Sequence, residues 1–337
     1  MVRKREIICE YQPYIDTAPV SSAELYQQSC SNDGPTVNSW RNTWVSQAKA
    51  NHEKFGPFKD KGIGKLWGKH HLKPAIVVGS GPSLKYNAAE LLENPGIPVI
   101  SCLHNFHFLE DLGVKVDYYV TLDAGPVTIE EISEGGTKSE DEYWALTKNR
   151  TLLAYIGTHP GLLEKWQGEI YFYSCPLPDQ GLMDEIEKIE KFRTSVSTGG
   201  NVLGACTYIA KAIFGCNPIA FIGADFSFSY SDKFHGWDSK YDKDMGQYVR
   251  MTDVFGNSVK SWQSYANFKA WFDSRAQSVP GDWVNCTEGG TFGAYPGGNI
   301  RAVKQVDLKD FIQVYRLHEH MKDQCENPET DQLKILF

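Results

Sequence analysis

The stretch Lys73-Pro-Ala-Ile-Val-Val-Gly-Ser-Gly-Pro-Ser-Leu84 decides the fold class of this chain. Its first half is a short apolar run that predicts a strand, and the glycines after it let the backbone turn tightly and approach a ligand closely. A helix predicted over 86–93 would direct unpaired N–H groups and its positive dipole end at that turn, which suits phosphate. The candidate nucleotide-binding residues here are Gly79, Ser80, Gly81, Pro82 and Ser83. A tight turn without a ligand is the alternative interpretation.

The same alternation of short apolar runs and helical stretches continues along the chain. Further strands are predicted over 98–103, 116–123, 152–157, 170–174 and 218–226, and further helices over 104–112 and 201–214. Strands separated by helices favour a parallel sheet that is covered by helices on both faces. The sequence therefore predicts an α/β protein with a Rossmann-like, mostly parallel sheet and a helical N-terminal extension.

The remaining segments predict how the chain is organised around this sheet. Residues 1–72 read as an N-terminal extension with one amphipathic helix over 37–54, in which Trp40, Trp44, Ala48 and His52 share a face, followed by a linker over 56–64. Residues 73–300 form the predicted Rossmann-like domain, and 301–337 a C-terminal helix (306–322) and tail. Within the domain we expect a long polar loop over 230–257 and a helix over 258–278, whose aromatic side is either core or a dimer face.

Composition excludes several classes of protein. The chain has 337 residues, 41% of them hydrophobic and 23% charged, which is typical of a globular protein rather than a disordered one. No apolar run approaches the ~18–20 residues of a membrane helix, and no secretory signal is recognised, so we expect a cytoplasmic protein without a membrane span. A net charge of −8 argues against binding to duplex nucleic acid. The eight cysteines form no C-x-x-C pair, so we expect free thiols rather than a structural zinc site.

A second glycine turn, Ser197-Thr-Gly-Gly-Asn-Val202, directly precedes a predicted helix. Thr198 or Ser197 would cap that helix, and the glycines would expose backbone donors to an anion. The candidate nucleotide-binding residues of this turn are Thr198, Gly199, Gly200 and Asn201. An ordinary helix cap with a packing glycine is the alternative.

Polar side chains follow three of the predicted strands. Asp225 and Asp123 each stand at the carboxyl end of a strand, where open parallel sheets bind ligands, and together they could hold a divalent ion. The alternative is that each caps a local turn. His235 in the polar loop is a candidate general base, with Asp225 as a second candidate catalytic residue. His104 and His107 flank Asn105 after the second strand, and one of them is expected to face the site.

Five motifs in order resemble a known family. They are the stretch from Lys73 to Leu84, Val116-Asp-Tyr-Tyr-Val-Thr-Leu-Asp, Ser197-Thr-Gly-Gly-Asn-Val, Gly215-Cys-Asn-Pro-Ile-Ala-Phe-Ile-Gly-Ala-Asp and Asn285-Cys-Thr-Glu-Gly-Gly. The pattern looks like the motility accessory factor family, which shares its domain with archaeal 6-hydroxymethyl-dihydropterin pyrophosphokinases. It is more distantly similar to sialyltransferases of the Campylobacter type. The resemblance covers residues 65–290.

The resemblance implies a nucleotide-binding transferase and assigns roles to both glycine turns. In the sialyltransferase relatives, positions matching Gly79, Gly81, Pro82, Ser83, Thr198, Gly199 and Gly200 bind the cytidine nucleotide. Their Cys-Asn pair is Cys102-Leu-His-Asn105 here, so the asparagine is shifted. Phe226 and Phe228 stand near the place of their phosphate-binding tyrosines, with Tyr230 close behind.

Three functions remain open at this point. The first is transfer of a nucleotide-activated sugar, such as a nonulosonic acid on CMP, to an acceptor hydroxyl, with no obligatory cofactor. The second is Mg²⁺-dependent transfer of diphosphate from ATP to a pterin-like alcohol, with the ion held by Asp123 and Asp225. The third is nucleotide binding by an accessory protein without turnover. The expected partners are a nucleotide or nucleotide-sugar donor and an acceptor that the sequence does not identify, and an oligomer is possible.

Overall fold

A sheet of eight parallel strands forms the centre of the molecule, in the order β13-β10-β7-β2-β3-β4-β5-β6. The computed structural model describes residues 10–190, 194–229, 235–237 and 248–326. The strands are β2 (Ala75–Val78), β3 (Val99–Cys102), β4 (Tyr118–Thr121), β5 (Thr151–Tyr155), β6 (Glu169–Tyr173), β7 (Ile219–Ile222), β10 (Trp283–Asn285) and β13 (Val303–Gln305). β13 pairs with β10, so residues beyond 300 still contribute to this sheet.

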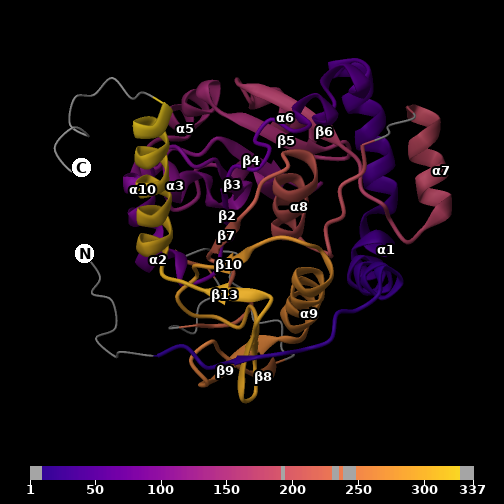
Figure 1. Ribbon diagram of the computed structural model, residues 1–337. Helices are drawn as coiled ribbons and strands as arrows, with labels where there is room; N and C mark the ends of the chain where they lie inside the picture. Colours follow the sequence, from indigo (N-terminus) through magenta and orange to yellow (C-terminus); the bar gives the residue numbers. More distant parts are fainter. Residues whose placement is uncertain (1–9, 191–193, 230–234, 238–247, 327–337) are drawn as a thin grey trace.

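Helices cover both faces of the sheet, which confirms the α/β Rossmann-like prediction. Strands β2, β3, β4 and β7 are buried along their whole length, which is why they read as continuous apolar runs. In Figure 1, α2, α3 and α10 lie on one side of the sheet, and α8 and α9 on the other. The helices are α2 (Leu84–Asn87), α3 (Phe106–Leu112), α4 (Val127–Glu130), α5 (Glu140–Leu146), α6 (Pro160–Lys165), α7 (Gln180–Ile189), α8 (Val202–Tyr208), α9 (Gln263–Ser278) and α10 (Leu308–Glu326).

The order of the strands creates a switch point between β2 and β7. From β2 the chain adds β3, β4, β5 and β6 in succession on one side, and it then returns to place β7 on the other side of β2. The loops after β2 and β7 therefore leave the sheet in opposite directions, and a crevice opens at the carboxyl ends of these two strands. Two of the strands that the sequence pattern singled out for this edge, β2 and β7, border that crevice.

The N-terminal extension is more ordered than its sequence predicts. Helix α1 spans Ser22–Phe55 rather than 37–54 and runs through Gly34 and Pro35, which read as turn residues. It begins with a capping box between Ser21 and Glu24 and packs against α6, α7 and α9. Trp44 and Ala48 are buried on its inner face, as predicted. None of the helices in the described ranges is long and apolar enough to cross a membrane.

The predicted linker over 56–64 is part of the folded body. It forms two short 3₁₀ turns, Phe58–Lys61 and Ile63–Leu66, whose apolar side chains Phe58 and Ile63 are buried. Gly62 pairs with Phe172 beside β6, and the backbone N–H groups of Phe58 and Lys59 donate to the Glu190 carboxylate at 2.6 and 3.0 Å. Because glycines at 56, 62 and 64 are typical of a linker, the composition of this segment did not predict these tertiary contacts.

Two small sheets complete the molecule and correct the predicted C-terminal third. The segment predicted as one helix over 258–278 is instead β9 (Ser258–Trp262) followed by α9. Strand β8 (Tyr248–Thr252), which lies inside the predicted loop, pairs with β9 antiparallel. Residues 230–234 and 238–247 of that loop lie outside the described residues. The second small sheet joins β1 (Tyr14–Ile15), β12 (Gly298–Ile300) and β11 (Ala294–Tyr295), so the N-terminal segment is paired with the glycine-rich region.

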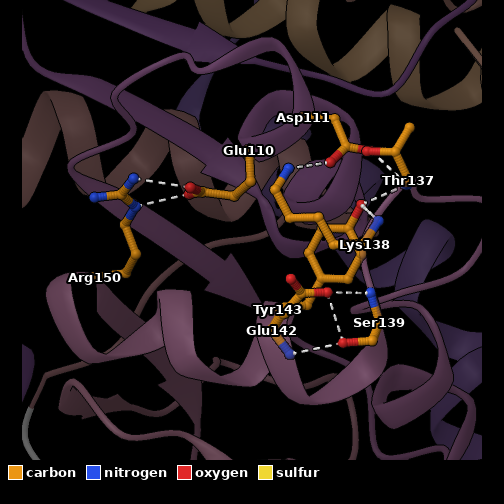
Figure 2. Close-up of polar contacts among 8 residues, drawn as sticks. All are labelled: Glu110, Asp111, Thr137, Lys138, Ser139, Glu142, Tyr143 and Arg150. Atoms are coloured by element: carbon orange, nitrogen blue, oxygen red, sulfur yellow. Dashed lines mark hydrogen bonds and ion pairs between the residues drawn. The ribbon is translucent and has the colours of Figure 1, made fainter.

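A polar network anchors α3 to the segment that precedes β5 (Figure 2). Glu110 on α3 is buried and accepts two hydrogen bonds from Arg150, at 2.7 and 2.8 Å, and one from the Tyr119 hydroxyl at 3.0 Å. The next residue, Asp111, accepts from the Thr137 backbone N–H at 2.8 Å and pairs with Lys138. Because charged groups with full sets of partners are rigidly oriented, the last turn of α3 is held in place.

Docking of α1 makes a testable contribution to stability. Trp44 is 5% exposed and its ring packs edge-on against Tyr155, with centroids 5.6 Å apart. We expect Trp44→Ala to lower the free energy of unfolding by about 3–5 kcal/mol, because it leaves a cavity between α1 and the body. Trp67, 70% exposed, is the matched control, and Trp67→Ala should change this free energy by less than about 0.5 kcal/mol. Urea denaturation measures both, and equal effects of the two substitutions would contradict the docking.

Candidate functional site

The turns after β2 and β7 meet backbone to backbone. The N–H of Gly79 donates to the carbonyl of Ile222 at 2.8 Å, and the N–H of Gly81 donates to the carbonyl of Gly223 at 2.9 Å. A Cβ atom at Gly81 would lie 2.7 Å from that Gly223 oxygen, so only glycine fits. These two N–H groups are therefore used inside the protein rather than offered to a phosphate. The following helix, α2, has only four residues, so its dipole adds little.

Asp225 joins the two turns on the ligand side of this contact. Its carboxylate oxygen Oδ2 accepts hydrogen bonds from the Ser83 hydroxyl at 2.7 Å and the Ser83 backbone N–H at 3.3 Å. The other oxygen, Oδ1, is buried and has no hydrogen-bond partner within the described ranges. Burial raises the pKa of Asp225 to about 7, against the lowering effect of hydrogen bonds from Ser83 and from the Ser229 side chain. Asp225 thus lines the crevice with a buried carboxyl group that is mostly held by Ser83.

A cavity of about 210 Å³ occupies this crevice. It is lined by Gly79, Ser80, Gly81, Pro82, Cys102, Leu103, His104, Val120, Thr121, Asp123, Glu131, Asn201, Val202, Leu203, Asp225, Phe226, Ser227, His235, Tyr265 and Phe268. Nine of the candidate site residues are among them: Gly79, Ser80, Gly81, Pro82, His104, Asp123, Asn201, Asp225 and His235. The structure therefore brings the first glycine turn, both strand-end acids and the loop histidine together.

The remaining candidates lie behind the cavity wall. Ser83 is engaged by Asp225, and Asn105 donates to the carbonyls of Val78 and Gly79 and to the Ser101 hydroxyl, so it supports the first turn from below. These side chains position the cavity wall and do not line the cavity itself.

The second glycine turn is held by packing rather than open to the cavity. A Cβ at Gly199 would collide with the Trp271 ring and one at Gly200 with Asn32, while the Thr198 hydroxyl donates to Asp33 at 3.2 Å. The cap of α8 is Asn201, whose Oδ1 accepts from the Gly204 N–H at 2.9 Å, and not Thr198 or Ser197. Of this turn, Asn201 alone among the four predicted residues lines the cavity. Its buried Nδ2 has no partner among the described residues.

One rim of the cavity carries the predicted His104 and His235 together with a carboxylate, Glu131, that the sequence pattern did not reveal. The rings of His104 and His235 pack with centroids 4.4 Å apart, and His235 stacks on Trp237 at 5.2 Å. Glu131 Oε1 lies 3.9 Å from His104 Nδ1. Burial lowers the pKa of both His104 and His235 to about 3, whereas burial and the charge of Asp123 raise the pKa of Glu131 to about 8. No spacing rule marks Glu131, because it reaches the rim from the turn after α4.

The described side chains would supply only part of the coordination of a metal ion at this site. Asp123 and Asp225 line the same cavity, and Asp225 Oδ1 is a carboxylate oxygen of the type that divalent cations prefer. Within the part of the chain that the structure describes, no three His, Cys, Asp or Glu side chains form a group that could hold a metal ion. Phosphate oxygens and water would have to complete the coordination.

The doubly wound parallel sheet and the cavity at its switch point define an α/β protein of the Rossmann-like class. The chain belongs to the 6-hydroxymethylpterin diphosphokinase MptE-like family, which matches residues 45–231, more than half of the sequence. Its fold is similar to that of the MAf glycosyltransferase from Magnetospirillum magneticum AMB-1, with a TM-score of 0.52 at 16% identity. The similarity covers 84% of this chain and 42% of that one, so this chain spans less than half of that protein. No curated protein matches the sequence.

These findings confirm the resemblance read from the five motifs, as far as the family and the fold are concerned. The more distant similarity to sialyltransferases stays a prediction. So do the nucleotide-binding and catalytic roles of individual residues, because the family and the fold alone do not assign them.

The contact between the two turns can be tested at Gly81. We expect Gly81→Ala to destabilise the protein by about 1–3 kcal/mol, because the added methyl group meets the Gly223 carbonyl and the Asp225 carboxylate and the turns must separate. Gly34→Ala in α1 is the control, since a Cβ there meets open space and should leave stability unchanged or raise it. Urea denaturation of both variants is the measurement. Wild-type stability of Gly81→Ala would show that the turns are not in contact.

The buried Asp225 predicts a specific dependence of stability on pH. A carboxyl group whose pKa is about 7 when folded and about 3.8 when unfolded binds its proton more tightly in the folded state. Its contribution to stability is therefore fully present below pH 4 and is lost as pH rises from about 4 to about 7. Asp225→Asn keeps an acceptor for Ser83 but cannot ionise.

We therefore expect the free energy of unfolding of Asp225→Asn to increase relative to that of the wild type as pH rises over this interval, by up to about 1.4 kcal/mol per pH unit. Urea denaturation at four pH values between 4 and 8 gives both curves. Curves that run parallel would mean that Asp225 ionises normally in the folded protein.

Proposed function

We propose that this chain is a nucleotide-dependent transferase that moves a sugar from a nucleotide-activated donor, of the CMP-nonulosonate type, to an acceptor hydroxyl. The observation that carries the proposal is the cavity at the carboxyl ends of β2, β3, β4 and β7, whose lining residues Asn201 and Asp225 each have a buried polar atom, Nδ2 and Oδ1, for which no hydrogen bond is found among the described residues. Buried polar atoms without partners are costly unless a ligand satisfies them.

The two atoms have complementary chemistry that suits a nucleotide. Asp225 Oδ1 can accept a hydrogen bond from a ribose or sugar hydroxyl, and such a bond would draw its pKa back down. Asn201 Nδ2, next to the first N–H groups of α8, can donate to a phosphate oxygen. Tyr265 and Phe268 from α9 line the same cavity and offer aromatic faces to a base or a sugar ring. The hydroxyl groups, the phosphate and the ring of a nucleotide sugar therefore each have a candidate partner in this cavity.

Transfer from such a donor needs a base for the acceptor and a way to stabilise the leaving phosphate. His235 lines the cavity, which supports its predicted place near the reacting groups. Phe226 also lines the cavity, near the place where the predicted similarity to sialyltransferases would put a phosphate-binding tyrosine, so another residue must stabilise the leaving group. Asn201 is our candidate for that role, because its amide is a donor and lies at a helix N-terminus.

Transfer of diphosphate from ATP to an alcohol is the second candidate function. The family match favours it, since the family is described by a diphosphokinase, and so does the presence of Asp123 and Asp225 in one cavity. These two carboxylates would hold Mg²⁺ together with the phosphates of ATP, and the ion would neutralise charge on the transferred group. Nucleotide binding without turnover stays the third possibility.

A thermal-shift panel of CMP, CDP, UDP, GDP, ADP and ATP, each with and without Mg²⁺, tests these proposals. A ligand that binds only the folded state increases the free energy of unfolding by RT ln(1 + c/Kd), about 2.7 kcal/mol when its concentration c is one hundred times Kd, and therefore raises Tm. We expect CMP or CDP to raise Tm without metal and Asp225→Ala to abolish the shift. A rise with ATP that requires Mg²⁺ would favour diphosphate transfer. Absence of any shift would overturn the nucleotide-dependent function in all its forms.

A further inference from the structure

His104 and Glu131 form a pair at the rim of the cavity that the proposed roles so far leave unused. Both side chains line the cavity, and His104 Nδ1 lies 3.9 Å from Glu131 Oε1. The second ring nitrogen, His104 Nε2, is buried and has no hydrogen-bond partner within the described ranges. At 3.9 Å the two groups are too far apart for a hydrogen bond, and a small movement of either side chain would bring them into the carboxylate–imidazole arrangement in which histidine acts as a general base.

The positions of both side chains are fixed by their surroundings. His104 lies in the turn Leu103–Asn105 at the end of β3, and Asn105 ties that turn to the carbonyls of Val78 and Gly79. His107, in the first turn of α3, has its Nδ1 3.2 Å from the backbone carbonyl of Glu131. The far end of α3 is anchored by the network of Figure 2, through Glu110 and Asp111. A base must be held at a constant distance from its substrate, and this framework supplies that rigidity.

We propose that His104 and Glu131 are the general-base pair of this site, with His104 Nε2 taking the proton of an acceptor alcohol. The proposal rests on the proposed transferase function and holds for both donors, because a sugar acceptor and a pterin-like acceptor each react through a hydroxyl. His235 then forms the wall against which the His104 ring packs, at 4.4 Å between centroids. Glu131 is a positioning residue, which acts through His104.

The step balances for either donor. The O–H bond of the acceptor breaks and its proton moves to His104 Nε2. The electron pair of the acceptor oxygen forms a bond to the anomeric carbon of the sugar, or to the β-phosphorus of ATP. The bond from that centre to the leaving phosphate oxygen breaks, and CMP or AMP departs with its electron pair. His104 afterwards returns the proton to solvent.

The charges around the pair determine its dependence on pH. The pKa of His104 is near 3 and that of Glu131 is near 8. Without a ligand at neutral pH, the His104 imidazole is therefore neutral and the Glu131 carboxyl group is protonated. Activity requires Glu131 to ionise, because only the carboxylate keeps the His104 proton on Nδ1 and leaves the Nε2 lone pair free. The charged or titratable groups that act on the pair are His235 and His107 on His104, and Asp123 and Glu134 on Glu131. The rate should therefore rise as pH increases through about 8.

The experiment uses the full chain with two reactions: CMP-N-acetylneuraminate with lactose, and ATP, Mg²⁺ and 6-hydroxymethyl-dihydropterin. For the reaction that the wild type catalyses, we expect Glu131→Gln to lower kcat about 10²-fold or more, with KM little changed, and to remove the rise near pH 8. His104→Gln should lower kcat at least as much. His71→Gln and Glu187→Gln, both exposed and outside the cavity, serve as controls for substitution of these residue types.

A second measurement does not depend on turnover. In protein with ¹⁵N-labelled histidine, the His104 signals, assigned by their loss in His104→Gln, should move toward the Nδ1–H tautomer as pH rises through 8, and should not do so in Glu131→Gln. Nucleotide binding with full activity of Glu131→Gln would overturn the pair and leave the transferase function standing. If no nucleotide binds the wild type, the proposed function fails, and a His104 tautomer that ignores Glu131 would then overturn the pair as well.

Discussion

The contact between the turn after β2 and the turn after β7 is the constraint on which the rest of the structure depends. Gly79 and Gly81 bond to carbonyls at the end of β7, and a side chain on either would push the two strands apart. Because these strands flank the switch point, the contact sets the floor of the cavity and places Asp225 beside the first turn. The glycines thus shape the cavity by close packing of backbone, and not by offering their N–H groups to a ligand.

Removal of water accounts for most of the electrostatics of the site. Burial favours the neutral form of every titratable group, so the pKa values of Asp225 and Glu131 rise while those of His104 and His235 fall. The result at neutral pH is a rim with little charge that is surrounded by polar atoms. Such a rim responds strongly to a charged ligand, because a phosphate or a cation in the cavity would shift all of these equilibria together.

The segment before the matched family range contributes to the same structure. Helix α1 lies partly outside residues 45–231, yet Asn32 donates to the carbonyl of Gly199 at 3.0 Å and Asp33 accepts from Thr198. The second glycine turn is therefore held from behind by a helix that the family does not define, and Asn201 takes its place on the cavity because that turn is supported. β1 similarly ties the N-terminal segment to the glycine-rich region through β12.

The sequence by itself determined the α/β class, the positions of β2, β3, β4 and β7, and the residues at the carboxyl edge of the sheet, because buried parallel strands are short and mostly apolar and polar or glycine residues follow soon after them. It did not determine the length of α1, the β8–β9 hairpin or the folding of 56–64, where tertiary contacts override local turn signals. Nor did it determine which candidates face the cavity. Only the tertiary structure turned Thr198, Gly199 and Gly200 toward α1 and α9 and brought Glu131 to His104, since those pairings join residues far apart in the chain that no local pattern relates.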